Sequence, residues 1–565
     1  MTSRESARRI RMLGLVVVAG AALTAGRSLW LGLVQGDALA NAARNQQQRL
    51  VTLPAQRGSI VDDAGQPLVV DRLTATVSAD PHLLLKNPDT SPAQAAAALA
   101  PILRIPRATL AAKLSADVGY TVLAKGVDQD VAKRVRALDI PNVDVEDTFT
   151  RFSPLGNAAA QVVGITTDKG GQSGLEQQYN SALVGTAGRR VEARDPQGQV
   201  LRTISSTDSV PGQTVQVTID ATLQQKAAAD LAAGVQAAKA KSGSVVVMRP
   251  QDGAILAMAS YPWFNPNNRR SLDPARLQNL PVQAPIEPGS TFKLVTIGAA
   301  LQEGRVTPHT VIHVPEVVKV YDRTLHDAHN KGAQDMTVAQ ILEESSNKGT
   351  VLVAKDKLGE ARMFAWTRRM GFGKRTGVDL PAEDPGRIPT YGNVASGWSG
   401  TSILNVPIGQ GVFVNQLQTA RAYAAVANGG YLVTPHVVSK VGSRTLGWPA
   451  GRRVYSSRTV HQLDAILRRV VSGQGTGELA KIPGYDGQVA GKTGTASKVD
   501  SATGQYSNSR YVASFVGYVP AGDPKLVIVV TIDEPHTSIY GGYVAAPIFS
   551  QVGRDFLTQL QIPPG

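Results

Sequence analysis

The sequence contains no cysteine, and aromatic residues make up only 5% of its 565 residues. The lack of cysteine excludes disulfide bonds, thiolate zinc sites and a cysteine nucleophile, although it does not identify the compartment. Acidic residues are also few, since 44 Asp and Glu face 58 Lys and Arg and the net charge is +14. This excess favours anionic surroundings such as lipid, wall polymers or nucleic acid, although scattered surface Lys and Arg explain it equally well.

A long uncharged run lies near the amino terminus. Four arginines within the first eleven residues precede Met12–Gly26, and apolar character continues to Val34. A helix from Met12 to Val34 would be roughly 35 Å long, enough to cross a bilayer. The basic flank predicts a cytoplasmic amino terminus and an extracytoplasmic body. A cleaved signal peptide is the alternative, but the apolar run continues past the small alanines at 19–22 that a peptidase would use.

The region that follows the apolar run has mixed character. Residues 36–50 predict a polar helical stalk, and short strands are expected at 50–53, 58–61 and 67–70. Ser91 followed by Pro92 is a strong helix start, and 128–138 is amphipathic. This part of the chain, up to about residue 205, predicts an irregular α+β module without a nucleotide, metal or acid/base site.

A different pattern begins near Pro211. The sequence predicts a helix at 221–240, a hairpin of strands at 244–248 and 254–260, further strands at 214–219, 511–519 and 526–532, and a last helix at 546–560. Strands at both ends with helical sequence between them indicate one antiparallel sheet, closed by terminal helices and interrupted by a large helical insertion.

The first segment with chemical potential is 287–293, with the sequence EPGSTFK. Pro288 and Gly289 break the chain before an apolar helix, so Ser290 lies in the first turn and Lys293 one turn later on the same face. A serine needs a base to remove its proton, and lysine is such a base only if burial or a second cation lowers its pKa. Alone the spacing is weak evidence, because Ser345 and Lys348 repeat it.

Two further segments carry suitable side chains. Ser345 and Asn347, at the end of the helical stretch 338–344, could relay a proton and hold an amide, although Ser and Asn are also common at helix ends. In Gly491–Thr495, Lys492 offers a cation for a carboxylate and Gly494 permits close backbone approach, although a purely structural strand is the alternative. A phosphate-binding loop is excluded, because it requires glycine where Asp486 lies and an apolar helix after Thr495.

Together the three segments form the ordered set Ser-x-x-Lys, Ser-x-Asn, Lys-Thr-Gly of the penicilloyl-serine transferases. Over nearly its whole length the chain resembles the class B penicillin-binding proteins. Further landmarks of that family are Arg57–Asp62 followed by Gly65, Gly174–Tyr179, and Thr376–Pro381. No glycosyltransferase segment separates the anchor from the next domain, which argues against class A, and Ser-Ser-Asn resembles septal, division-type members.

The resemblance implies an α+β multidomain fold: a transmembrane helix, an irregular α+β pedestal (dimerisation) domain, and a transpeptidase domain with a central antiparallel sheet between terminal helices and a large helical subdomain. The expected segments are 1–36 for the cytoplasmic tip and anchor, 37–205 for the pedestal, 206–243 for a connecting strand and helix, and 244–560 for the transpeptidase domain.

The resemblance also implies a role for each motif residue. Ser290 would be the acylated nucleophile and Lys293 its base, while Ser345 would pass the proton to the leaving amine. Asn347 would hold the donor amide, and the positive potential of Lys492 would help keep Lys293 neutral. Thr493 and Thr495, on either side of Gly494, would bind the substrate carboxylate, and the N–H groups of Ser290 and Thr495 would form the oxyanion hole.

The implied activity is D,D-transpeptidation of D-Ala-D-Ala stem peptides in the septal wall, with inhibition by β-lactams. The implied partners are the membrane and a glycan polymerase of the shape, elongation, division and sporulation type, and we expect no nucleic acid, cofactor or metal. His326 and His329 could pose as a metal pair, but a solvated loop is expected there. A D,D-carboxypeptidase or β-lactamase on the same scaffold, and a non-catalytic division scaffold, are the alternatives.

Overall fold

The structure is a computed structural model that describes residues 3–33, 35, 48–194, 200–268, 272–320, 323–328, 331–473, 475–500 and 503–564. The chain divides into two compact units, one formed by 1–56 with 185–211 and the other by 57–184 with 212–565. The predicted stalk lies mostly outside the described residues, as does His329.

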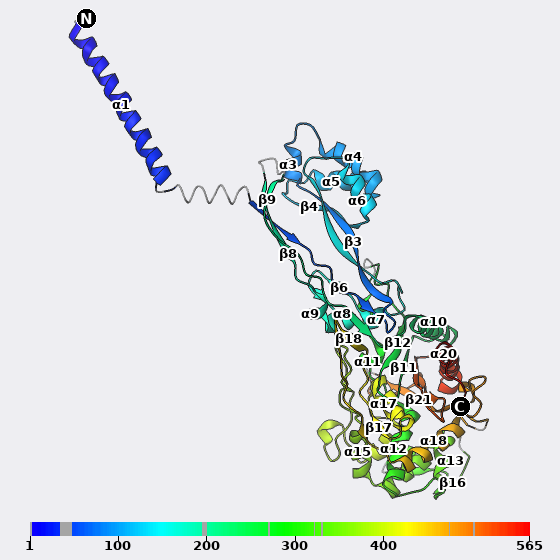
Figure 1. Cartoon of the computed structure of the whole chain (residues 1–565). Coiled ribbons are helices and arrows are strands. Elements are labelled where there is room, and N and C mark those ends of the chain that lie inside the picture. The colour runs from blue at the N-terminus through cyan, green and yellow to red at the C-terminus, as the bar shows by residue number, and fades with distance from the viewer. Residues whose placement is uncertain are drawn as a thin grey trace. The chain divides into compact units, whose positions relative to one another are not determined.

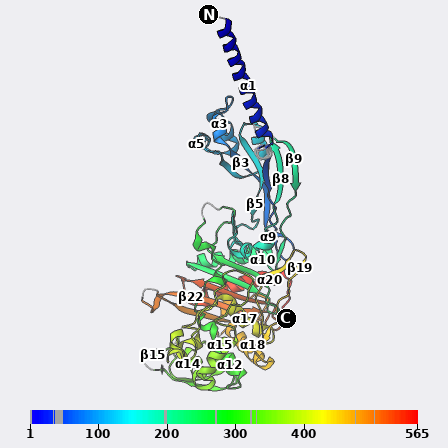
Figure 2. The same cartoon turned by 90° about the vertical axis from the view of Figure 1, so that its left-hand side faces the viewer.

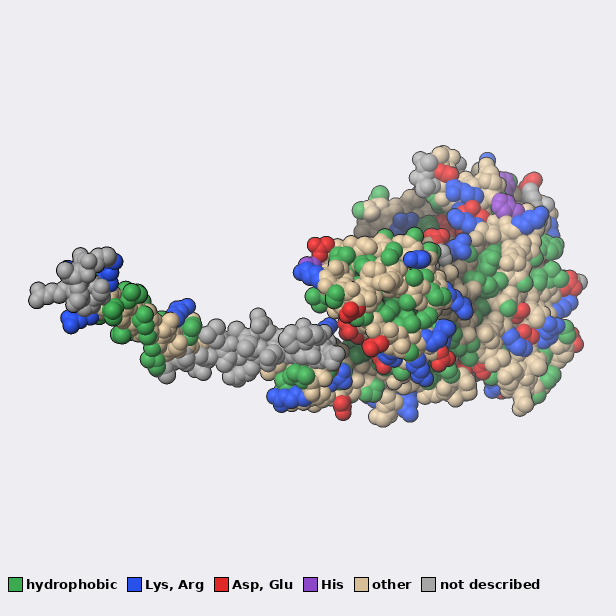
Figure 3. Space-filling view, turned by 90° about the horizontal axis from the view of Figure 1, so that it is seen from above, with side chains coloured by type: hydrophobic (Ala, Val, Ile, Leu, Met, Phe, Trp, Pro, Cys, Tyr) green, Lys and Arg blue, Asp and Glu red, His purple; other side chains and the backbone are tan. Residues whose placement is uncertain are grey.

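The first unit contains one long helix and one small sheet. Helix α1 (Ser3–Leu33) includes Arg8–Leu31, a stretch that is long and apolar enough to cross a membrane. Hydrophobic side chains gather along it in the space-filling view (Figure 3). Strands β1 (Gln48–Leu53), β8 (Gly188–Arg194) and β9 (Val200–Thr207) form an antiparallel sheet in the order β1-β8-β9.

The second unit contains a seven-stranded sheet in the order β19-β18-β10-β2-β3-β4, in which β5 pairs with β3. Strands β3, β4 and β18 of this sheet are labelled in Figure 1. Its strands are β2 (Ile60–Val61), β3 (Pro67–Ala79), β4 (Thr121–Val127), β5 (Val143–Phe152), β10 (Val215–Val217), β18 (Val438–Val441) and β19 (Arg444–Thr445). The predicted strand at 214–219 is thus only three residues long, and it pairs with β2 and β18.

Short helices accompany this sheet. They are α3 (Pro81–Leu85), α4 (Pro92–Leu103), α5 (Arg107–Leu114), α6 (Gln129–Arg136), α7 (Ala160–Val163), α8 (Gly174–Gln178) and α9 (Asn180–Leu183), with the strand pair β6 (Thr166–Thr167) and β7 (Gly170–Gly171). The helix predicted to start at Ser91-Pro92 is confirmed, because the Ser91 side chain and Gln94 form a capping box. Leu84, Leu99 and Leu110 pack with Val77 of β3 in a separate hydrophobic cluster.

Buried charges tie together four segments of this region. Glu176 of α8 accepts hydrogen bonds from the Nε atoms of Arg57 and Arg151, each at 2.6 Å. Asp71 of β3 accepts from the backbone N–H of Arg57 at 2.7 Å and from Arg151 Nη1 at 3.2 Å. The side chains of Glu176 and Arg151 are only 1% and 7% exposed, so this is a buried ionic network.

A second buried carboxylate joins two of the family landmarks. Asp379 accepts a hydrogen bond from the hydroxyl of Tyr179 at 2.9 Å, and from the backbone N–H groups of Val437 and Val438 at 2.7 and 2.9 Å. Asp379 therefore links Tyr179, just before α9, to the start of β18 within the insertion.

The predicted antiparallel sheet is confirmed and has five strands in the order β12-β11-β23-β22-β21. Its strand β22 is labelled in Figure 2. They are β11 (Ser242–Met248), β12 (Ile255–Tyr261), β21 (Ala490–Val499), β22 (Tyr506–Val519) and β23 (Leu526–Asp533). Side chains of β11 alternate between two cores. Val245 and Val247 pack with the terminal helices α10 (Ala221–Ala237) and α20 (Ala546–Gln559), whereas Val246 and Met248 face the insertion.

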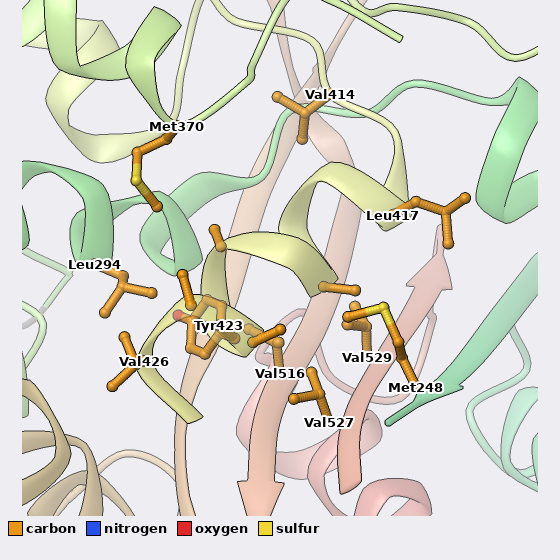
Figure 4. Close-up of a cluster of buried hydrophobic side chains, with 14 of the residues drawn as sticks. Met248, Leu294, Met370, Val414, Leu417, Tyr423, Val426, Val516, Val527 and Val529 are labelled. Atoms are coloured by element: carbon orange, nitrogen blue, oxygen red, sulfur yellow. The ribbon is translucent and has the colours of Figure 1, made fainter. Parts of the chain in front are cut away.

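The insertion lies between β12 and β21. Its larger helices are α12 (Lys293–Gln302), α13 (Val338–Glu343), α14 (Asn347–Leu352), α15 (Glu360–Arg369), α17 (Gln416–Ala427) and α18 (Ser457–Val471). Leu294 of α12 and Tyr423 of α17 belong to the same buried cluster as Val516, Val527 and Val529 of the sheet, and Figure 4 shows Tyr423 beside Val516. This packing holds the start of α12 beside β21.

Shorter elements complete the insertion. They are α11 (Leu280–Gln283), α16 (Ser402–Asn405), the 3-10 turns η2 (Pro274–Leu277), η3 (Gly289–Phe292), η5 (Val394–Ser396), η6 (Val406–Ile408) and η7 (Glu478–Ala480), and the π-helical η4 (Val353–Leu358). The strand pairs are β13 (Val311–Val314) with β16 (Gln334–Thr337), β14 (Val318–Val320) with β15 (Arg323–Leu325), and β17 (Tyr431–Leu432) with β20 (Arg452–Arg453). Helix α19 (Gly541–Val544) precedes α20.

The ionic network predicts a large stability difference between two substitutions. Glu176→Ala leaves two buried guanidinium groups without their shared carboxylate, so we expect the free energy of unfolding to fall by about 3–5 kcal/mol. Lys125→Ala removes an ion pair with Asp168 at 4.0 Å, in which the two side chains are 67% and 101% exposed. It should change the free energy of unfolding by less than about 1 kcal/mol. Denaturant titration of the two variants compares them, and equal stabilities would contradict the structural role of the network.

Candidate active site

The turn that carries Ser290 packs so closely against β21 and the end of η6 that Gly289 and Gly409 have no space for a side chain. Gly289 has a φ of +55°, and a Cβ there would lie 2.6 Å from the carbonyl oxygen of Thr495. Its backbone N–H donates to Gly409, and a Cβ on Gly409 would lie 2.2 Å from the oxygen of Gly289. Two glycines are therefore required to bring the turn η3 against β21 and η6.

Lys293 is the first residue of α12 and is fully buried. Its Nζ donates to the carbonyl oxygen of Ser345 at 2.5 Å, to Ser345 Oγ at 3.2 Å and to Asn347 Oδ1 at 2.7 Å. Ser345 has a φ of +62°, which is uncommon for a residue other than glycine. In this conformation both of its oxygen atoms lie within hydrogen-bond distance of the same amine, so the first two sequence motifs meet at Lys293.

The third motif lies on β21, the edge strand of the five-stranded sheet. Lys492 is fully buried, and its Nζ donates to the carbonyl oxygen and to Oγ1 of Thr493 at 3.3 and 3.4 Å. The Thr493 hydroxyl also bonds the hydroxyl of Thr476 at 2.8 Å. A Cβ on Gly494 would lie 2.3 Å from Ser514 Oγ and 2.9 Å from Thr291, so this glycine permits the close approach of η3.

Burial and like charge act together on the two amines. Burial, and secondly the nearby charge of Lys492, hold the pKa of Lys293 well below its usual value, while Asp327 acts in the opposite direction. Burial lowers the pKa of Lys492 to about 7. Burial and the charge of Lys492 therefore favour the neutral form of Lys293, the form that accepts a proton, more than in an exposed lysine.

Ser290, Ser345, Asn347, Thr493 and Thr495 line one cleft of about 620 Å³. Lys293, Lys492 and Gly494 are buried in its wall. The structure thus brings all eight predicted residues to one place, from η3, α12, the α13–α14 junction and β21. The cleft is also lined by Asp327, Lys331, Glu344, Gln410, Thr476, Tyr540 and Tyr543, none of which the sequence motifs identify.

Glu287 is a buried group near the site whose role was not predicted, although it opens the first motif. Its Oε1 accepts hydrogen bonds from the backbone N–H of Gly411 at 2.9 Å and from the Tyr506 hydroxyl at 3.0 Å. Burial raises the pKa of Glu287 to about 7. No sequence signal connects Tyr506 with Glu287, because the two residues are far apart in the chain.

The loop that contains His326 is only partly the solvated loop that was expected. His326 is exposed, but its neighbour Asp327 is half-buried and lines the cleft.

Comparison with known proteins gives a consistent result over both units. Residues 243–553 match the penicillin-binding protein transpeptidase domain, and 52–217 match the penicillin-binding protein dimerisation domain. The chain is 32% identical to the probable peptidoglycan D,D-transpeptidase PbpC of Pseudomonas aeruginosa, over 100% of this chain and 97% of that protein. It is 31% identical to the peptidoglycan D,D-transpeptidase FtsI of Escherichia coli, over 98% and 92%.

A solved structure supports the same grouping. The crystal structure of penicillin-binding protein 3 from Mycobacterium tuberculosis in complex with aztreonam matches with a TM-score of 0.70 and 28% identity, over 91% of this chain and 98% of that one.

The buried state of Lys492 predicts a pH-dependent stability difference. Because the folded-state pKa of about 7 is below the usual 10.5, the unfolded chain binds more protons between these values, and stability rises with pH across this range. Lys492→Met removes the buried charge, so we expect it to be more stable than the unmodified protein below pH 7. One pKa unit corresponds to about 1.4 kcal/mol, so the difference should be several kcal/mol and should shrink toward pH 10.

Thermal unfolding as a function of pH measures this difference. Lys525→Met, at a lysine whose side chain is 43% exposed and pairs with Asp523, is the control and should show no trend of this size. A pH-independent effect of Lys492→Met would contradict the burial of a charge at this position.

Proposed function

Since the chain belongs to the class B penicillin-binding proteins, of the septal type, we propose that Ser290, Lys293, Ser345, Asn347 and Lys492 carry its reaction. The protein is a serine-type peptidoglycan D,D-transpeptidase that is acylated by β-lactams. The single observation that supports these residue assignments best is the bonding of Lys293 Nζ to Ser345 and Asn347 beside the cleft that Ser290 lines.

In the proposed acylation step, neutral Lys293 accepts the proton of the Ser290 hydroxyl as Oγ attacks the carbonyl carbon of the penultimate D-Ala. A neutral amine has two N–H groups and one lone pair. Its shortest contacts, to the carbonyl of Ser345 and to Asn347 Oδ1, are with obligate acceptors and use both N–H groups. The lone pair is then free for the proton of Ser290.

The proton then has a route to the leaving amine. The hydroxyl of Ser345 lies 3.2 Å from Lys293 Nζ and lines the cleft, so it can pass the proton from Lys293 to the departing D-Ala. The N–H groups of Ser290 and Thr495 stabilise the oxyanion, and each such donor typically contributes a factor of about 10²–10³.

The remaining residues position the donor peptide. We assign the amide of Asn347 to the donor backbone, and the hydroxyls of Thr493 and Thr495 to the terminal carboxylate, with Gly494 allowing the strand to approach. Lys492 supplies positive potential beneath this carboxylate. An amine of a neighbouring stem peptide then attacks the acyl ester, its proton returns through the same groups, and the cross-link forms with Ser290 restored.

The apolar helix α1 supports a membrane-anchored protein. We propose that the amino terminus is cytoplasmic and the catalytic region extracytoplasmic, with segments 1–36, 37–205, 206–243 and 244–560 as the anchor, pedestal, connection and transpeptidase domain. The matches over 52–217 and 243–553 support a division of this kind. We also propose a membrane glycan polymerase of the shape, elongation, division and sporulation type as the partner that supplies glycan strands.

Mass spectrometry of the penicillin-treated protein tests the assignment of the nucleophile. We expect one penicilloyl group on Ser290, long-lived because a transpeptidase lacks an efficient deacylating water, and its complete loss in Ser290→Ala. Ser345 provides an internal comparison because it also precedes a lysine by three positions. Ser345→Ala should retain the adduct on Ser290 and form it more slowly.

An adduct on Ser345 would contradict the assignment. Rapid release of the opened drug would favour the hydrolase, and growth of cells that rely on the Ser290→Ala protein would favour a non-catalytic scaffold.

The absence of cysteine allows a clean test of topology. We expect a membrane-impermeant maleimide to label Ser457→Cys in cells with an accessible outer surface, and to label Ser3→Cys only after the membrane is opened. The unmodified protein is the blank for both. Equal labelling of the two positions before membrane opening would contradict the proposed orientation.

A further inference from the structure

The carboxylate of Asp327 is bonded to the segment that follows Ser345, although the two are separated along the chain. Asp327 Oδ1 accepts from the backbone N–H groups of Asn347 at 2.5 Å and Lys348 at 3.0 Å. Its Oδ2 accepts from the hydroxyl of Ser346 at 2.9 Å. A single side chain from the loop between β15 and β16 thus satisfies the amino-terminal end of α14, whose first N–H groups have no partner inside the helix.

The same loop also fixes the orientation of the Asn347 amide. The carbonyl oxygen of His326 accepts from Asn347 Nδ2 at 3.2 Å. Because Nδ2 is engaged on this side, Oδ1 points to Lys293 Nζ, which donates to it at 2.7 Å. The backbone and the side chain of Asn347 are therefore both held by residues 326–327, and Lys293 is aligned through Asn347.

We propose that Asp327 is a positioning residue of the reaction proposed above, which holds Asn347 and its neighbours in register with Lys293 and Ser345. The inference rests on the proposed function, because it assigns a part in that reaction to a residue outside the three sequence motifs. Substitution of Asp327 should therefore affect acylation more than it affects folding.

The negative charge of Asp327 should change the pH dependence of acylation, an effect that a purely structural side chain would not have. Among the described residues, Lys492 from β21 and Asp327 from the β15–β16 loop are the charged groups that act on the pKa of Lys293. Lys331, Glu344 and Glu478 also line the cleft, and Lys331 pairs with Glu344 at 2.7 Å while Glu478 pairs with Lys481 at 3.1 Å. The negative charge of Asp327 raises the pKa of Lys293, against the larger effects of burial and Lys492. Removal of this charge makes the neutral amine available at lower pH.

Asp327→Asn and Asp327→Ala separate charge from position. Asparagine keeps an oxygen for the N–H groups of Asn347 and Lys348 but carries no charge. In Asp327→Asn we expect the acidic limb of the pH–rate profile for acylation to move to lower pH, because the pKa of Lys293 falls when the negative charge is removed. Alanine removes both features, and a misplaced catalytic group costs on the order of 100-fold in rate. The measurement is the second-order rate of acylation of the full-length protein by a fluorescent penicillin across pH, with thermal unfolding beside it.

Asp335→Asn is the matched control, since it also neutralises one aspartate of the same strand region but one that is 66% exposed and paired with His313. It should leave both the rate and the acidic limb unchanged. An acidic limb in Asp327→Asn that stays in place or moves to higher pH would overturn the proposal, as would Asp327→Ala acylating within about threefold of the unmodified rate.

If Asp327→Ala does not fold, the pH profile of Asp327→Asn alone decides the question. Failure of the unmodified protein to form the Ser290 adduct would instead refute the proposed function, so the two failures are distinguishable.

Discussion

Exclusion of water from two lysine amines is the constraint on which the rest of the site depends. Lys293 and Lys492 are both fully buried, and the charged form of each disfavours the charged form of the other. Burial of this kind requires a rigid and well-packed surrounding, because a mobile wall would readmit water and restore the ordinary proton affinity of lysine. The packing of α12 and α17 against the five-stranded sheet, with Leu294 and Tyr423 in its core, provides that wall.

Backbone conformations that few residues tolerate bring the residues of the three motifs together. Gly409 allows the end of η6 to touch η3, and Gly289 and Gly494 allow η3 and the edge strand β21 to approach each other. Ser345 reaches Lys293 with two oxygens only because the chain takes a left-handed turn between α13 and α14. Asp327 secures the end of this turn from outside the motif. The site is thus formed by main-chain geometry as much as by the side chains that give the family its signature.

Local patterns in the sequence were sufficient for much of this. The strands β11, β12, β22 and β23, the helices α10 and α20 at the two ends of the sheet, and the helix start at Ser91 follow from short-range periodicity and end signals. The motif residues were identifiable because their spacing is shared by a family. In contrast, the pairing of β10 with β2 and β18, the network around Glu176, and the contacts of Asp327 and Tyr506 join residues far apart in the chain. No local signal encodes such contacts, so they were absent from the predictions.

The central claim is that Lys293 is a neutral base in the resting protein. Nuclear magnetic resonance of protein with ¹³C-labelled lysine, titrated across pH and assigned by comparison with Lys293→Met, measures the pKa of this amine directly. The account predicts a pKa of Lys293 well below the usual 10.5. It also predicts that this pKa rises when Lys492 is replaced by methionine, because a nearby positive charge is removed. A Lys293 signal that titrates near 10.5, with or without Lys492, would contradict the account.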